Sequence, residues 1–139
     1  MVQNLDLWKK YQNEYLRMKK ANSSDPVQKL LWHGTRCDPN IIMKKDGFSS
    51  QFANDQGLWG RAIYFAQLAD YSHGYAKKSS ENKSALFFAS VLTGKHIEMA
   101  SDRSLRVPPD GYDSVKGRTR DHDVYMVYQN DKTYPMFHV

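Results

Sequence analysis

The residue types that most often carry chemistry are scattered along this chain. The five histidines stand far apart, and Cys37 is the one cysteine. The sequence has no cysteine cluster and no close pair of histidines with a glutamate, so it predicts no metal site. It also has no glycine-rich phosphate loop, and no serine stands in a nucleophile elbow. Any catalytic chemistry must therefore come from a different arrangement.

Two short strings stand out instead. They are Leu31-Trp32-His33-Gly34-Thr35 and Ile63-Tyr64-Phe65-Ala66, the second followed by Ser72 and Tyr75. A His-Gly-Thr triplet alone is a weak signal, but the joint pattern is far more specific. With these motifs the sequence resembles the catalytic domain of the poly(ADP-ribose) polymerase family, the diphtheria-toxin-like ADP-ribosyltransferases. The likeness continues through residues 91–94, 107–109, 112–117, 124–128 and 134–135. It is closest to the branch that transfers single ADP-ribose units.

This resemblance implies a site for NAD, the donor of ADP-ribose. His33 would hydrogen-bond the adenosine ribose, because imidazole has one donor and one acceptor nitrogen. Gly34 would present its backbone to the nicotinamide carboxamide, a close approach that glycine allows. Thr35 would complete the NAD-binding turn, chiefly by supporting it. The alternative is that His33 and Gly34 bind no ligand and are a core histidine and a turn glycine at the end of a strand.

The second motif would hold the nicotinamide ring. By resemblance, Tyr64 and Tyr75 would sandwich the ring, and stacking contributes about 0.5–1.5 kcal/mol beyond area burial. Ser72 would hydrogen-bond the carboxamide. Ser72 and Tyr75 share one face if they lie on a helix. The alternative is a tyrosine-rich face that only packs.

The sequence departs from the family pattern at Val124. Chain-forming relatives carry a glutamate there, which bonds a ribose hydroxyl and polarises the acceptor, whereas valine can do neither. General-base help is worth about 10²–10⁴ in rate, so its loss removes elongation more readily than first transfer. Asp123 is no easy substitute, because neighbouring strand residues point to opposite faces. The catalytic positions implied are thus His33, Tyr64 and Val124, the last without a reactive group.

Two further positions near the second motif are open to alternative interpretations. Ala62 stands where the family usually has glycine, so its methyl group would either crowd the pocket or stiffen the strand. Residues 51–60 resemble the family's donor loop, and Trp59 would either cover a ligand or pack inward. Arg61 would either meet the NAD pyrophosphate or remain solvated.

The elements that must position these residues follow from periodicity and turn signals. Residues 5–21 are predicted to form an amphipathic helix capped by Asn4, with Trp8, Tyr11, Tyr15 and Met18 on the face that packs on the fold. A short helix is expected over 40–46, ended by Gly47, and a second long helix over 66–78. Strands are expected at 30–32, 62–65, 86–93, 124–128 and 134–139, the last two joined around Asn130 and Asp131, with an exposed loop over 48–61. This order predicts an α+β fold with antiparallel β-sheets packed together and flanking helices.

Composition limits the broad class of the protein. The chain has 139 residues, of which 40% are hydrophobic and 13% aromatic, so it is expected to fold as one catalytic domain over 1–139. No apolar run approaches the length of a membrane span, and residues 1–10 lack the apolar core of a signal peptide. Because Cys37 cannot form an internal disulfide, an intracellular location, cytoplasmic or nuclear, is expected. The net charge of +5 favours anionic partners.

Three functions remain after these arguments. The first is an NAD-dependent mono-ADP-ribosyltransferase that uses no metal and modifies an acceptor protein, including itself. The second is an NAD-binding or interaction module of the same fold with weak or absent catalysis, which Val124 and Ala62 suggest. The third is transfer to a nucleic-acid end, which the positive charge suggests but which no separate series of base-stacking aromatic residues supports.

Overall fold

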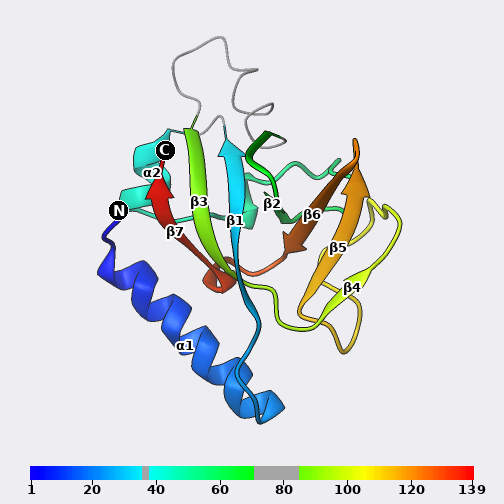
Figure 1. Cartoon of the computed structure of the whole chain (residues 1–139), viewed down its shortest axis with the longest axis horizontal. Coiled ribbons are helices and arrows are strands. Elements are labelled where there is room, and N and C mark those ends of the chain that lie inside the picture. Colours follow the sequence, from blue (N-terminus) through cyan, green and yellow to red (C-terminus); the bar gives the residue numbers. More distant parts are fainter. Residues whose placement is uncertain (36–37, 71–84) are drawn as a thin grey trace.

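A computed structural model describes residues 1–35, 38–70 and 85–139 of the chain. In this part of the chain, one seven-stranded sheet has the strand order β4-β5-β6-β2-β1-β3-β7, and helices flank it (Figure 1). The elements in chain order are α1 (Leu5–Asn22), β1 (Gln28–Thr35), α2 (Pro39–Lys44), η1 (Ser50–Phe52), β2 (Ile63–Ala66), β3 (Ala85–Leu92), β4 (His96–Glu98), β5 (Ser114–Thr119), β6 (His122–Val127), η2 (Asn130–Lys132) and β7 (Thr133–His138). The predicted α+β class is confirmed.

The sheet differs in detail from the arrangement that the sequence predicts. Hydrogen bonds join all the described strands into one sheet rather than separate sheets, and β4 and β5 run parallel. In Figure 1, β5 and β6 cross the view at an angle to β1 and β3. Because twist accumulates from strand to strand, the two ends of one sheet can face different cores. Strands β4 and β5 were not predicted, because they are short or contain a glycine and so have a weak strand pattern.

Strands β6 and β7 are consecutive in the chain but do not pair. η2 joins them around Asn130 and Asp131 as expected, yet β6 pairs with β2 and β5, whereas β7 pairs with β3 at the sheet edge. Figure 1 shows their connection passing the lower ends of β1 and β3. Consecutive strands usually lie side by side, and a local hydrophobic pattern cannot reveal the exception.

Helix α1 forms for the reasons that the sequence suggested. The side chain of Asn4 accepts a hydrogen bond from the Leu7 backbone N–H at 3.1 Å, which caps the first turn. Tyr11 and Met18 are fully buried against the sheet edge, while Trp8 remains 38% exposed and stacks on the Tyr11 ring. Burial raises the pKa of Tyr11 to about 12. No helix among the described residues has the length and apolarity needed to cross a bilayer.

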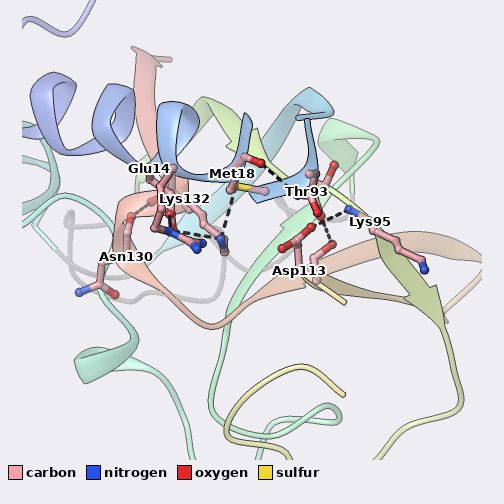
Figure 2. Close-up of polar contacts among 11 residues, drawn as sticks. Glu14, Met18, Thr93, Lys95, Asp113, Asn130 and Lys132 are labelled. Atoms are coloured by element: carbon pink, nitrogen blue, oxygen red, sulfur yellow. Dashed lines mark hydrogen bonds and ion pairs between the residues drawn. The ribbon is translucent and has the colours of Figure 1, made fainter. Parts of the chain in front are cut away.

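A buried ion pair fastens α1 to the β6–β7 connection. Lys132 Nζ lies 3.0 Å from Glu14 Oε2 and 3.5 Å from Met18 Sδ (Figure 2), while Arg17 binds the other oxygen of Glu14. Burial alone would raise the pKa of Glu14, but hydrogen bonds from Arg17 and Lys132 outweigh it and lower the pKa below its usual value. Glu14 is therefore ionised at neutral pH, and removing either partner would leave a costly buried charge.

Each face of the sheet carries its own apolar cluster. Alternate residues of β2 and β6 contribute to the two clusters, as the two-residue period of a strand requires. The first cluster consists of Val2, Leu31, Ile42, Phe48, Ile63, Phe65, Phe87, Ala89, Val91, Tyr125 and Val127. The second, called here the Trp59 cluster, consists of Trp59, Ala62, Val115, Val124, Met126 and Tyr128. The prediction of an exposed loop over 48–61 is wrong for Phe48 and Trp59, which are 3% and 2% exposed.

Candidate active site

Strand pairing brings the two sequence motifs together. The antiparallel strands β1 and β2 pair at Trp32 and Ala66. Continuing this antiparallel register sets Gly34 across from Tyr64. The His33 side chain spans the two strands, because its Nδ1 lies 2.7 Å from the Tyr64 carbonyl oxygen. His33, Gly34 and Tyr64 therefore gather at one place, as the sequence predicts.

The environment of His33 determines which of its nitrogens is available. A carbonyl oxygen only accepts, so Nδ1 must donate to Tyr64, and in the neutral ring Nε2 is then an acceptor. The ring packs edgewise against Phe48, with 4.8 Å between ring centroids. Burial lowers the pKa of His33, and the hydrogen bond to the Tyr64 carbonyl offsets this only in part. His33 is therefore neutral at pH 7 and suited to accept a hydrogen bond from a sugar hydroxyl.

The hydroxyl of Tyr64 is fully used inside the protein. It donates to the Gly60 carbonyl oxygen at 2.9 Å and accepts from the Trp59 backbone N–H at 2.9 Å. A phenol has one proton to donate, so this hydroxyl is not available for proton transfer unless these contacts break. The Tyr64 side chain is partly exposed, and a flat aromatic ring of this kind suits stacking on another flat ring.

Val124 lies near Tyr64 but brings no polar atom. It is the register partner of Ala66 on β2 and of Gly117 on β5. Because strand residues alternate, Val124 and Tyr64 face the same side of the sheet. The Val124 side chain is 0% exposed and packs in the Trp59 cluster. The position of the family's glutamate is thus occupied by an apolar, fully buried group.

The neighbouring Asp123 does not replace that glutamate. It pairs in register with Arg118, and its carboxylate lies 3.0 Å from the Arg118 guanidinium. The alternation of strand residues directs Asp123 away from the face that holds Tyr64 and Val124. The expectation that Asp123 points to the opposite face therefore agrees with the register.

The segment before β2 is braced from several sides. Trp59 packs inward, with its indole N–H donating to the Met99 carbonyl oxygen at 3.2 Å, which decides the alternative that the sequence left open. Arg61 donates to the carbonyl oxygens of Ser50 and Gln51, both at 3.0 Å. The Arg61 guanidinium therefore holds the loop's own backbone, while the side chain remains 39% exposed. Ala62 is 3% exposed and its methyl group fills space in the Trp59 cluster.

The remaining predicted site residues are Thr35, Ser72 and Tyr75. Thr35 ends β1, in register with Ala85 of β3. Ser72 and Tyr75, together with the greater part of the helix predicted over 66–78, lie outside the described residues. Within the described ranges, no three His, Cys, Asp or Glu side chains gather as a group that could hold a metal ion.

A cavity of about 620 Å³ lies elsewhere, between α1 and the connection 128–131. Its lining consists of polar side chains of those two segments and Ser50, and none of His33, Gly34, Tyr64 and Val124 lines it. The cavity therefore does not mark the place where the two motifs meet.

One residue at the candidate site was missed by the sequence analysis. The buried Tyr128 hydroxyl donates to the Trp59 carbonyl oxygen at 2.7 Å. The two residues lie far apart in the chain, and a tyrosine at the end of an apolar strand reads as an ordinary core residue. Tyr128 ends the stretch 124–128 that resembles the family, but nothing in that stretch indicates its contact with Trp59.

Comparisons with known proteins support the family resemblance. The family described as "Poly(ADP-ribose) polymerase catalytic domain" matches residues 1–139. The chain is 30% identical over 145 residues to human protein mono-ADP-ribosyltransferase PARP12, which covers 98% of this chain and 20% of that protein. It is 28% identical over 139 residues to mouse protein mono-ADP-ribosyltransferase PARP10, covering 93% of this chain and 14% of the relative.

A third relative is human protein mono-ADP-ribosyltransferase PARP3, which is 31% identical over 116 residues, or 81% of this chain and 22% of that protein. The chain thus spans between 14% and 22% of the length of these curated relatives. The family match covers every described element, including the two strands that meet at His33 and Tyr64. The chain belongs to the poly(ADP-ribose) polymerase catalytic-domain family.

Proposed function

We propose that this chain transfers single ADP-ribose units from NAD to a side chain of an acceptor protein and releases nicotinamide. The observation that carries the proposal is the junction of β1 and β2. There a neutral His33, whose Nδ1 donates to the Tyr64 carbonyl oxygen and whose Nε2 is an acceptor, lies beside a tyrosine whose hydroxyl is held by Trp59 and Gly60. Family membership and the printed names of the relatives support the same activity.

The residues of this chain would hold the donor rather than react with it. The His33 Nε2 accepts a hydrogen bond from a ribose hydroxyl, and the Tyr64 ring stacks on nicotinamide. In the transfer step, the glycosidic C1′–N bond breaks with oxocarbenium character, and nicotinamide leaves with the bonding electron pair. An acceptor oxygen then forms the new bond to C1′ from the opposite face.

The apolar Val124 bears on which acceptor this reaction takes. A hydroxyl acceptor must lose its proton, which normally needs a general base. A carboxylate acceptor is already ionised at neutral pH and needs none. We therefore propose Glu or Asp side chains as acceptors, on a partner protein or on this chain itself. The absence of a carboxylate at Val124 also supports transfer of one unit over chain growth.

The same observation favours a second candidate function. With a buried valine at the catalytic position, the chain would bind NAD without transferring ADP-ribose. The two functions differ in turnover and not in donor binding, so binding and transfer must be measured separately.

The decisive experiment is the intact mass of the purified chain after incubation with NAD. Transfer predicts one or a few ADP-ribose increments that vanish in His33→Ala and Tyr64→Ala. His138→Ala, which changes an exposed histidine on the edge strand β7, serves as the matched control and should keep them. A long ladder of increments would overturn the single-unit proposal. Calorimetric NAD binding without any increment, also in the presence of an acceptor-rich lysate, would favour the binding module.

A further inference from the structure

We infer that Tyr128 is a positioning residue for Tyr64, acting through the backbone of Trp59. The inference rests on the proposed function, because it concerns the ring that would stack on nicotinamide. Tyr128 belongs to the Trp59 cluster, against which Tyr64 packs, and hydrogen bonds link the two tyrosine hydroxyls through the Trp59 backbone. The contacts between the two tyrosines form a continuous chain.

Three hydrogen bonds make up that chain. The Tyr128 hydroxyl donates to the Trp59 carbonyl oxygen at 2.7 Å. The backbone N–H of Trp59 donates to the Tyr64 hydroxyl at 2.9 Å. The Tyr64 hydroxyl in turn donates to the Gly60 carbonyl oxygen at 2.9 Å. Trp59 is therefore held on its carbonyl side by one tyrosine and holds the other tyrosine through its amide.

Close packing leaves this series of hydrogen bonds little freedom to shift. A Cβ atom on Gly117 would lie 2.0 Å from Cζ2 of Trp59, so the indole seats directly against the β5 backbone. A Cβ atom on Gly57 would lie 2.4 Å from the Tyr64 hydroxyl oxygen, so the turn closes on that hydroxyl just as tightly. The indole N–H adds a bond to the Met99 carbonyl oxygen. Interiors packed this closely transmit small displacements rather than absorb them.

Loss of the Tyr128 hydroxyl would loosen this arrangement at one point. Without it the buried Trp59 carbonyl loses its partner, and the Trp59–Gly60 backbone is free to move toward a new one. The Tyr64 ring would then leave the orientation set by its two bonds. A flat ligand held by that ring would bind less tightly, while chemistry after binding would be nearly unchanged.

The test compares Tyr128→Phe with a matched variant, Tyr134→Phe. The two hydroxyls are alike in that Tyr134 is also buried and its hydroxyl donates to the Val2 carbonyl oxygen and accepts from the Asn4 N–H. They differ in place, because Tyr134 holds the segment that leads into α1. Tyr128→Phe should raise the dissociation constant for NAD by about threefold to tenfold, the equivalent of one hydrogen bond. Tyr134→Phe should leave it unchanged. Where transfer is measurable, KM should rise with kcat nearly constant.

A double-mutant cycle tests the route of the effect. Tyr64→Phe removes the other end of the chain, so the double variant with Tyr128→Phe should bind NAD about as weakly as Tyr64→Phe alone. Strictly additive effects, or equal losses of affinity in Tyr128→Phe and Tyr134→Phe, would overturn the inference.

A spectroscopic readout separates this inference from the proposed function. With 3-fluorotyrosine incorporated, the resonance that disappears in Tyr64→Phe is assigned to Tyr64. In the absence of any NAD, that resonance should shift or broaden in Tyr128→Phe and stay in place in Tyr134→Phe. An unmoved resonance refutes the positioning role even if NAD binds. A moved resonance with no NAD binding by the unaltered chain upholds the positioning of Tyr64 and refutes the proposed function instead.

Discussion

Restoring the family's glutamate at Val124 is expected to destabilise this chain in a pH-dependent way. The Val124 side chain is 0% exposed and is surrounded by the Trp59 cluster. The polar groups of that cluster are already bonded, because the Tyr128 hydroxyl donates to Trp59 and the Trp59 indole donates to Met99. Among the described residues, a carboxylate introduced by Val124→Glu would therefore find no free donor in this cluster.

The magnitude follows from linkage between ionisation and folding. A carboxyl group buried without partners titrates up to about 3–5 pH units above its ordinary value, and each unit corresponds to about 1.4 kcal/mol. Because protons bind more tightly in the folded state, the penalty is absent below about pH 4 and grows as the pH rises. At pH 7 it amounts to about 3–4 kcal/mol, a large part of the 5–15 kcal/mol typical of a domain.

Urea denaturation of Val124→Glu between pH 5 and pH 8 measures this penalty. The matched control is Val124→Gln, because a glutamine side chain has nearly the same shape as glutamate and its amide does not titrate. The difference in unfolding free energy between the two variants should increase by about 1.4 kcal/mol for each pH unit. A difference that stays constant over this range would refute the reasoning, because it would mean that the carboxylate reaches solvent or a cation.

Three further predictions concern other parts of the fold. Arg17 and Lys132 lower the pKa of Glu14, so the stability that the Glu14 carboxylate contributes should be lost as the pH falls through that lowered pKa. Acid unfolding curves of the unaltered chain should therefore be steeper than those of Glu14→Gln, and identical curves would contradict this. Gly117→Ala should lower the free energy of unfolding by about 1–3 kcal/mol and shift tryptophan emission to longer wavelength, because the added methyl group collides with Trp59. In the control Gly111→Ala, the methyl group would meet nothing within 4 Å, so the emission should be unchanged. Because burial keeps His33 neutral, the affinity for NAD measured by calorimetry should be constant from about pH 6.5 to pH 8. A fall in affinity that follows histidine protonation in this range would show that the His33 ring titrates in the site.

Much of the local structure could be predicted from the sequence, because it depends on neighbouring residues. The Asn4 cap and the apolar face of α1 are set by side chains within a few turns of one another. Gly47 takes a positive φ of 65° shortly after α2, as predicted for a helix end. The strand cores of β1, β2 and β3 are rich in residues that favour extended backbone. Such signals survive without knowledge of the rest of the chain.

The candidate site is partly of this kind. His33, Gly34 and Tyr64 carry recognisable motifs, and their types already indicate what each could bind. That the motifs meet could be expected only through the family resemblance, because a short local pattern does not encode the partner of a strand. The register of β1 with β2, and the bond from His33 to the Tyr64 carbonyl, are properties of the folded sheet.

What the sequence by itself determined is the class of the fold and the course of α1, and its family resemblance predicts the residues that would hold NAD. Only the tertiary structure decided that Trp59 points inward, that Val124 is buried in an apolar cluster, and that Tyr128 and Tyr64 both bond the Trp59 backbone. The physical reason is the distance along the chain. These contacts join residues of separate strands and loops, and they form because the folded sheet brings those backbones close enough for packing and hydrogen bonds to select one arrangement.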